Sequence, residues 1–500
     1  MLNSAFLYSF QSNKETENQM FKIGLGRIGC LHLLKKKQVS KRIALKKFRR
    51  RVRRKKHNSL LKKRRIIEFE RNTPYRKLAK NVRCFQDALN LFLPRNLGYM
   101  LANEHCLFNS KRLKWNKKVL QCVLEVPKEF SIITNPQESY LFIQKIVSAF
   151  IYQRCNELWI DYKVCAKTDL LTQVFLDAIL LDIDKYHRLC KKASLEKYIN
   201  WAAVGGRNYY DDSIGRMINS VGSPSILINR KVSYKEIIPF RLRCFDGINA
   251  SSQTKSAQKE IDATIVLEYV NDCLKRMNKS LNQSALRELG CVIGETLINA
   301  EEHSSLNYRY MIGYFEECKD DSQHYGVFNL VIMNFGQSIY EKFKYPQNME
   351  KINTKFLDKM GVLSEKFTKK RLFKSNEFTE ENLWTLYSLQ QGVTCVPDQH
   401  RGNGTIQFIE SFFKLKGKNE VDDVSRMYIL SGNTVIEFDG TYRLSDLKDD
   451  EGVPRGIISF NTSGSLLDKP DSRYVRNVDQ YFPGTAIYIR ILLNEEDVIK

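Results

Sequence analysis

The sequence predicts a multidomain α/β protein with a basic N-terminal arm. A chain of 500 residues is too long for one ordinary core, and an apolar fraction of 43% with 11% aromatic residues is typical of folded domains. From about residue 128 onward, segments of strand and helix character alternate. The parts that we expect are a basic arm over 1–70, a helical connector over 71–127, a small α/β domain over 128–250 and a larger α/β domain over 256–500.

The net charge of +24 is concentrated in the arm. Between Lys35 and Arg65 there are eighteen Lys or Arg, and no Asp or Glu lies between Glu17 and Glu68. Without these residues the net charge is about +6, which is ordinary for the remaining length. Such a segment repels itself, so we expect it to be flexible or helical, and counterion release on phosphate contact favours RNA or DNA as its partner through residues 35–65. A solubilising tail, a surface for an acidic protein and a nuclear-import signal are the alternatives.

The rest of the composition favours a cytoplasmic protein that does not enter a membrane. The first ten residues lack the pattern of a secretory signal peptide, and the longest apolar stretch, near 174–181, is far shorter than the ~20 residues of a spanning helix. Twelve cysteines are scattered between Cys30 and Cys395 without a C-x-x-C pair. This pattern argues against a zinc ribbon or a disulfide framework and suits a reducing compartment.

The small α/β domain is expected to contain one clear strand and two well-bounded helices. These elements are a strand at 158–162, a helix over 170–183 that Asp169 caps, and a helix that follows Asp212 and ends at Gly222. This order resembles that of STAS-like domains. The resemblance implies a protein-interaction or regulatory role for the segment.

The larger α/β domain contains a long insertion. Apolar periodicity predicts helices over 261–277 and 284–302 and strands at 310–315, 327–333, 427–430, 435–438 and 485–493. Between Ile339 and His400 lie about sixty residues rich in lysine, which is far longer than an ordinary connection. We expect this insertion (340–400) to be either a lid that closes over a site or a solvated excursion of the chain.

The first chemical motif lies on the helix over 284–302. Glu295, Asn299 and His303 are one helical turn apart and therefore project from one stripe. In a buried face each of these groups would need a polar partner. Beside a hydrated metal–phosphate, an asparagine oxygen can bind Mg²⁺ and a carboxylate can polarise the water that attacks the terminal phosphate. A solvent-facing polar stripe is the alternative.

Two turns that contain glycine follow in the sequence. Asn334 and Gly336 come directly after a strand, where a chain without a Cβ can approach a ligand closely. The segment 401–405, Arg-Gly-Asn-Gly-Thr, opens an apolar helix, and backbone N–H groups at such a start bind phosphates. Each turn taken alone is also consistent with ordinary chain reversal.

Together the three motifs resemble the N, G1 and G2 boxes of the GHKL ATPases, from about residue 256 to 496. The form Asn-Ala-x-x-His-Ser is closest to the anti-sigma-factor kinases and related ATP-binding proteins. The resemblance implies a Bergerat α/β sandwich, a mixed sheet with helices on one face, with ATP and Mg²⁺ as cofactors. The implied site residues are Glu295 as general base, Asn299 as Mg²⁺ ligand, and His303, Asn334, Gly336, Arg401, Gly402, Gly404 and Thr405 around the nucleotide.

The chain departs from the family at two positions of the second motif. Asn334 stands where the family usually has the Asp that receives the adenine amino group, and Ser338 stands where a second glycine is common. An asparagine can accept that hydrogen bond but loses its charge-assisted part. We therefore expect weaker selection for adenine.

The function implied by the resemblance is a nucleotide switch that couples ATP binding and slow hydrolysis to a protein or nucleic-acid partner, for example in bacterial signalling or defence. A Ser/Thr protein kinase is one alternative, with Thr168 as acceptor, although 164–168 lacks the Asp-Ser-x-Gly pattern of anti-sigma antagonists. A nucleic-acid-binding scaffold with a non-catalytic nucleotide site is the other. Glu295 favours turnover because a pure binding site needs no base. The oligomeric state stays open, with a homo-oligomer among the options.

Overall fold

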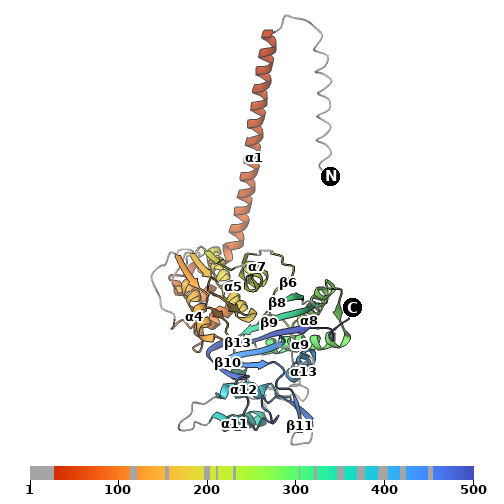
Figure 1. The fold of residues 1–500 in the computed structure, drawn as a ribbon. Helices are drawn as coiled ribbons and strands as arrows, with labels where there is room; N and C mark the ends of the chain where they lie inside the picture. The colour runs from red at the N-terminus through yellow and green to blue at the C-terminus, as the bar shows by residue number, and fades with distance from the viewer. Residues whose placement is uncertain are drawn as a thin grey trace. The chain divides into compact units, whose positions relative to one another are not determined.

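The chain forms two compact units that divide after Leu78 (Figure 1). The computed structural model describes residues 28–112, 121–152, 157–195, 203–209, 212–228, 232–302, 304–319, 324–345, 354–368, 378–391, 393, 404–416, 424–448 and 454–499. Among the helices that these ranges contain, none combines the length and apolar character needed to cross a membrane.

The described part of the first unit is one long helix, α1 (Ile28–Leu78), of 51 residues. From Arg49 to Glu70 every side chain that the structure describes is exposed, and even Leu60 and Phe69 are 59% exposed. No acidic residue precedes Glu68 in this helix, so its cations are offset by no intervening carboxylate. The described part of the basic arm is therefore a solvated helix, one of the two conformations that the sequence allows.

The second unit begins with short helices and a small parallel sheet. These elements are η1 (Ala79–Asn81), α2 (Phe85–Phe92), α3 (Arg95–Ala102), β1 (Gln121–Glu125), α4 (Pro136–Val147), the π-helical turn η2 (Ser148–Tyr152), β3 (Glu157–Asp161) and β5 (Ala203–Arg207). The sheet has the order β1-β3-β5, and both pairs are parallel. β1 lies inside the segment expected to be a helical connector, so this sheet begins earlier than the sequence suggests.

Two helices of this region begin where their caps predict. α5 (Leu170–Lys192) starts after Asp169, whose carboxylate accepts a hydrogen bond from the Thr172 N–H at 2.7 Å. α6 (Ser213–Val221) starts after Asp212 in the same way and is followed by Gly222 and α7 (Ser223–Ile228). The two helix starts predicted from the sequence are confirmed. The short strands β2 (Glu129–Phe130) and β4 (Lys167–Thr168) pair in parallel just before α5.

The centre of the second unit is a five-stranded sheet of order β10-β13-β9-β8-β6. Its strands are β6 (Ile237–Asp246), β8 (Tyr308–Lys319), β9 (His324–Phe335), β10 (Arg426–Phe438) and β13 (Val475–Leu493). All four pairs are antiparallel, where a mixed sheet was expected. The four residues between β8 and β9 are too few for the crossover that a parallel pair needs. β6 also belongs here, although the sequence assigns it to the preceding domain.

Helices cover both faces of this sheet, where helices on one face were expected (Figure 1). α8 (Ser252–Lys275), α9 (Gln283–Glu302) and α13 (Gly404–Lys416) pack on one face, and α4 and α5 contact β13 on the other. Alternation along β9 places Leu330 and Ile332 in the core under α9, whereas Phe335 meets Phe175 of α5 with ring centroids 6.0 Å apart. Burial on both faces explains why β9 is a nearly continuous apolar run.

The insertion between the second and third motifs is partly a core element. It contains α10 (Ile339–Lys344), α11 (Thr354–Thr368) and α12 (Glu380–Ser388). Leu383, Trp384 and Leu386 of α12 are 0%, 4% and 1% exposed, and they belong to the same core as the sheet. A solvated excursion is therefore the wrong description for α12, because its apolar face packs beside β10 and β13.

One strand replaces two that the sequence predicts. β10 runs without interruption through Gly432, where the pairing with β13 shifts register and the glycine has φ of +56°. In the sequence, a glycine that forms a bulge looks the same as a glycine that ends a strand, so one strand was predicted as two. The remaining short pairs are β11 (Ser445–Lys448) with β12 (Pro454–Ile457) and β7 (Ser280–Leu281) with β14 (Val498–Ile499).

Candidate functional site

The described residues of the first motif lie on a partly buried stripe of α9. Its fully buried positions Leu289, Val292 and Leu297 anchor it in the core. Glu295 and Asn299, one turn apart, are only partly buried. The helix is therefore fixed by its apolar face while these two polar side chains remain accessible at its edge.

The start of α13 lies against Glu295. A Cβ placed on Gly404 would overlap the carboxylate of Glu295, so any side chain at this position would displace that group. Further along the same two helices, the Ser411 hydroxyl donates to Glu288 Oε2 at 2.7 Å. The two contacts place α13 alongside α9 with opposite direction. A carboxylate at the first residue of a helix is also favoured by the helix dipole.

The end of β9 is tied to the residues that follow α9. Gly336 has φ of +135°, and a Cβ there would overlap the Ser305 hydroxyl. The Gln337 N–H donates to Ser305 Oγ at 3.0 Å, and the Ser304 hydroxyl donates to the Phe335 carbonyl at 3.4 Å. The second motif therefore meets the C-terminal end of α9, and its glycine is required both by conformation and by the close approach of Ser305.

Asn334 is fully buried, and both ends of its amide are engaged. Its Nδ2 donates to the Ala300 carbonyl at 2.5 Å, and its Oδ1 accepts from the Thr485 N–H at 3.3 Å. The side chain thus joins β9 to the last turns of α9 and to β13. Its partner Thr485 was placed on a strand by the sequence, but nothing in the local pattern indicated this hydrogen bond.

The other predicted site residues divide into two groups. Thr405 lies in the first turn of α13 beside Gly404 and is half-buried. His303, Arg401 and Gly402 lie outside the described residues. The structure thus brings Gly404 against Glu295 in the middle of α9. It places Gly336 beside the residues that follow the C-terminal end of α9.

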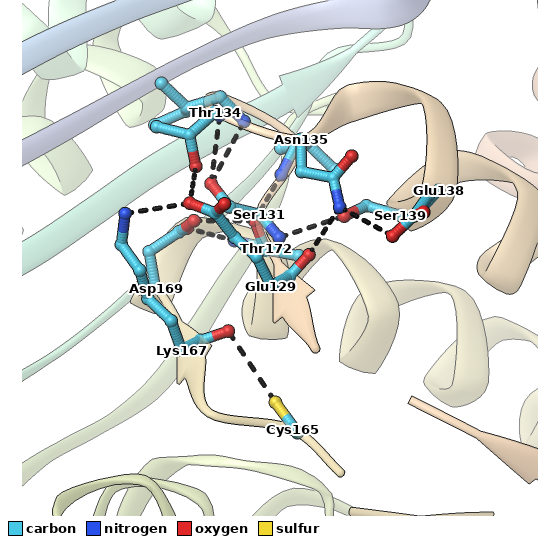
Figure 2. Close-up of polar contacts among 12 residues, drawn as sticks. Glu129, Ser131, Thr134, Asn135, Glu138, Ser139, Cys165, Lys167, Asp169 and Thr172 are labelled. Atoms are coloured by element: carbon cyan, nitrogen blue, oxygen red, sulfur yellow. Dashed lines mark hydrogen bonds and ion pairs between the residues drawn. The ribbon is translucent and has the colours of Figure 1, made fainter. Parts of the chain in front are cut away.

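A second polar cluster surrounds the start of α5 (Figure 2). Asp169 accepts from both the N–H and the hydroxyl of Thr172, at 2.7 and 2.9 Å, and burial raises the pKa of its carboxyl group. Glu129 accepts from the Thr134 hydroxyl at 2.7 Å and from Lys167 Nζ at 2.8 Å. This cluster holds the short strands β2 and β4 against the helix; the cap by Asp169 was predicted from the sequence, whereas the contacts of Glu129 were not.

Thr168, the acceptor that the kinase hypothesis requires, belongs to this second cluster. It lies on β4, and its hydroxyl oxygen is buried without a hydrogen-bond partner in the described part of the chain. A kinase could reach this hydroxyl only if β4 moved away from its neighbours.

Comparisons with protein-family models, with curated proteins and with solved structures found no match to this chain. Assignment of a function therefore depends on the chain's own residues. Within the described ranges, no group of three or more His, Cys, Asp or Glu side chains is placed to hold a metal ion. A Mg²⁺ ion bound by one asparagine oxygen, waters and phosphate oxygens needs no such group.

Proposed function

We propose that this protein is a Mg-ATP-binding switch of the GHKL type, with slow hydrolysis of the bound nucleotide. The observation that carries the proposal is the contact between Glu295 on α9 and Gly404 at the start of α13. These residues are about a hundred positions apart, and each comes from one of the motifs that resemble the family's nucleotide boxes. Because Gly404 lies against Glu295, the backbone N–H groups at the start of α13 are next to a carboxylate. The N–H groups can bind a phosphate, and the carboxylate can act as the base in its hydrolysis.

The architecture around this contact supports the same proposal. α8, α9 and α13 pack together on one face of the sheet, which is where the resemblance to a Bergerat sandwich puts its helices; α4 and α5, on the other face, are additional to it. Asn334 points to that face because it bonds to the Ala300 carbonyl of α9. The second motif therefore reaches the same side of the sheet as the first and the third.

In the proposed site each residue has a separate task. Asn299 would hold Mg²⁺, which would supply charge neutralisation at the phosphates. Gly404 and Thr405 offer backbone N–H groups of the first turn of α13 to the phosphates. Glu295 orients a water and accepts its proton during attack on the terminal phosphate.

Recognition of the base follows from the hydrogen bonds of Asn334. Asn334 is completely buried and its amide already binds the Ala300 carbonyl and the Thr485 N–H, so an adenine amino group could reach the remaining lone pair of its oxygen only if these neighbours moved. We therefore propose modest base selection, with ATP and GTP bound within about tenfold of each other, a difference of ~1.4 kcal/mol.

Phosphate release tests the hydrolytic part of the proposal. Glu295→Gln keeps the size of the side chain but removes the base, so the rate should fall by about 100-fold or more, the usual contribution of a positioned base. Glu410→Gln, on the exposed side of α13, is the matched control and should keep the wild-type rate. Equal rates for wild type and Glu295→Gln would overturn the assignment of this residue as the base.

A second function is favoured by α1. A helix of 51 residues whose described side chains are exposed from Arg49 to Glu70 gives its cations free access to a phosphate backbone. We propose that α1 binds nucleic acid without sequence preference, so that nucleotide state in the second unit is coupled to a nucleic-acid partner.

Charge removal within the intact chain tests this second function. Replacing the seven Lys and Arg of 49–56 by Gln should weaken binding of a DNA or RNA duplex by about tenfold or more at roughly 0.1 M salt. The slope of log K against log salt should become shallower, by about 0.9 for each DNA phosphate that the arm no longer neutralises. An unchanged slope and affinity would show that α1 is not the binding element.

A further inference from the structure

A cavity of about 480 Å³ lies on the other face of the central sheet, away from α9 and α13. One wall comes from β4, the start of α5 and α6, with Lys167, Asp169 and Met217. The opposite wall comes from β8, β10 and β13, with Tyr314, Tyr428 and Arg490. The polar cluster of Figure 2 therefore forms one rim of this cavity. Its volume is in the range of small-molecule sites.

Buried hydrogen-bonding atoms at and beside this cavity lack partners. Arg490 Nε, Asn329 Nδ2 and Thr168 Oγ1 are each buried and have no hydrogen-bond partner among the described residues. Asn329 and Arg490 are paired across β9 and β13, so their two donors are neighbours on one face. An unsatisfied buried hydrogen-bonding atom costs about 1–3 kcal/mol, and Arg490 is the charged residue among these three and also lines the cavity.

The charges around the cavity indicate what charge a bound ligand would carry. Arg426 pairs with Glu437 and Asp439 at 3.1 and 3.5 Å, so its charge is already balanced. In the described part of the chain no carboxylate pairs with Arg490, whereas Asp169 and Glu316 line the same cavity. One cation without a partner beside two carboxylates favours a ligand with a single negative charge over a phosphate ester.

The tyrosine rings in the cavity wall indicate the shape of the uncharged part of the ligand. Tyr428 and Tyr488 are stacked across β10 and β13, with ring centroids 6.1 Å apart and an angle of 15° between the rings. Tyr314 lies on the neighbouring part of the sheet and also lines the cavity. Flat tyrosine surfaces pack well against a planar apolar body.

We propose that this cavity binds a small aromatic monocarboxylate, with the Arg490 guanidinium donating to the carboxylate and the tyrosines packing against its ring. The bound molecule contacts the α5–α6 region and the central sheet at once, so it stabilises the contact between them. The site is separate from the proposed nucleotide site, which lies on the opposite face of the same strands. Each of the two proposals can fail without the other.

Benzoate is the probe for this site, measured by calorimetry and by the melting temperature of the full chain. Benzoate should bind and raise the melting temperature, and the neutral isostere benzamide should bind at least tenfold more weakly. Arg490→Gln should weaken benzoate binding by at least tenfold. Arg188→Gln, an exposed arginine paired with Asp184 on α5, is the matched control and should bind as wild type.

A blocking variant keeps the test decisive if Arg490→Gln does not fold. Ser213→Trp places a large ring at an exposed position of the cavity wall and should abolish benzoate binding while the melting temperature without ligand is retained. Absence of benzoate binding to the wild type, equal binding by Ser213→Trp, or equal affinity for benzamide would overturn the proposal. Tighter binding of inorganic phosphate than of benzoate would overturn the carboxylate assignment.

Discussion

Asn334 holds three segments together through one side-chain amide. It is completely buried and bonds to the Ala300 carbonyl of α9 and to the Thr485 N–H of β13. The donor half of the amide is essential here, because a carboxylate in the same place would set an oxygen against a carbonyl oxygen. The fold of this chain therefore requires an amide, and not a carboxylate, at position 334.

Asn334→Asp should destabilise the protein by about 1–3 kcal/mol, the cost of a buried polar group that loses its partner. Urea unfolding followed by circular dichroism measures this change. Asn90→Asp, at an exposed position of α2, is the control and should change stability by less than about 0.5 kcal/mol. Unchanged stability together with tighter ATP binding in Asn334→Asp would show that the side chain serves the nucleotide and not the fold.

Asp177 is a buried carboxyl group whose titration affects stability. It is 1% exposed on α5 and accepts from Gln173 Nε2 at 2.9 Å and from the Ser223 hydroxyl. Burial raises its pKa from 3.8 to about 7. The folded state thus retains a proton that the unfolded chain releases, so this contribution to stability is present below about pH 4 and is lost as the pH rises through about 7.

Asp177→Asn should remove that pH dependence. In the wild type this group lowers the free energy of unfolding between about pH 4 and pH 8, by a few kcal/mol if each pKa unit counts about 1.4 kcal/mol. In the variant, the change in the free energy of unfolding between these two pH values should differ from that of the wild type by this amount, as measured by urea titrations. Asp184→Asn on the same helix should leave the wild-type dependence intact, and a wild-type dependence in Asp177→Asn would contradict the burial argument.

Whole elements differ in how well the sequence predicts them. The starts of α5 and α6 are predicted because a cap involves neighbouring residues, and Asp169 and Asp212 provide it locally. The role of α12 is not predicted, because its burial depends on β10 and β13, which lie far along the chain from it. β10 is divided in two by the sequence pattern because Gly432 resembles a turn while it forms a bulge.

Trp384→Ala tests whether α12 is a core element. Trp384 is 4% exposed, its Nε1 donates to Ser364 Oγ at 3.1 Å, and its replacement should cost about 3–5 kcal/mol of unfolding free energy. Val362→Ala, at a position of α11 that is 71% exposed, is the control from the same insertion and should change little. A cost below about 1 kcal/mol for Trp384→Ala would mean that the insertion is a solvated excursion after all.

At the scale of the whole molecule, one sheet separates two proposed sites. Its strands carry Asn334 toward α9 on one face and Arg490 toward the cavity on the other. The sequence indicates the first site because the residues of this site lie in short motifs with characteristic spacing. It does not indicate the second, since Thr168, Tyr314 and Arg490 come from three distant segments and no local pattern unites them.

The same limit applies within the first site. Helical spacing alone places Glu295 and Asn299 on one stripe, but the contact of Glu295 with Gly404 depends on how α13 packs along α9. That packing rests on the apolar faces of both helices, with Phe408 and Phe412 of α13 fully buried. The sequence therefore predicts the motifs, whereas tertiary packing decides which of their side chains meet.

Calorimetric titration of the full chain with ATP, with and without Mg²⁺, tests the central proposal most directly. The proposal predicts one ATP bound per chain, binding that requires Mg²⁺, and an affinity at least tenfold weaker in Asn299→Ala, while Asn90→Ala binds as wild type. Absence of ATP binding by the folded wild-type protein at millimolar nucleotide and Mg²⁺, or equal affinity in Asn299→Ala, would contradict it.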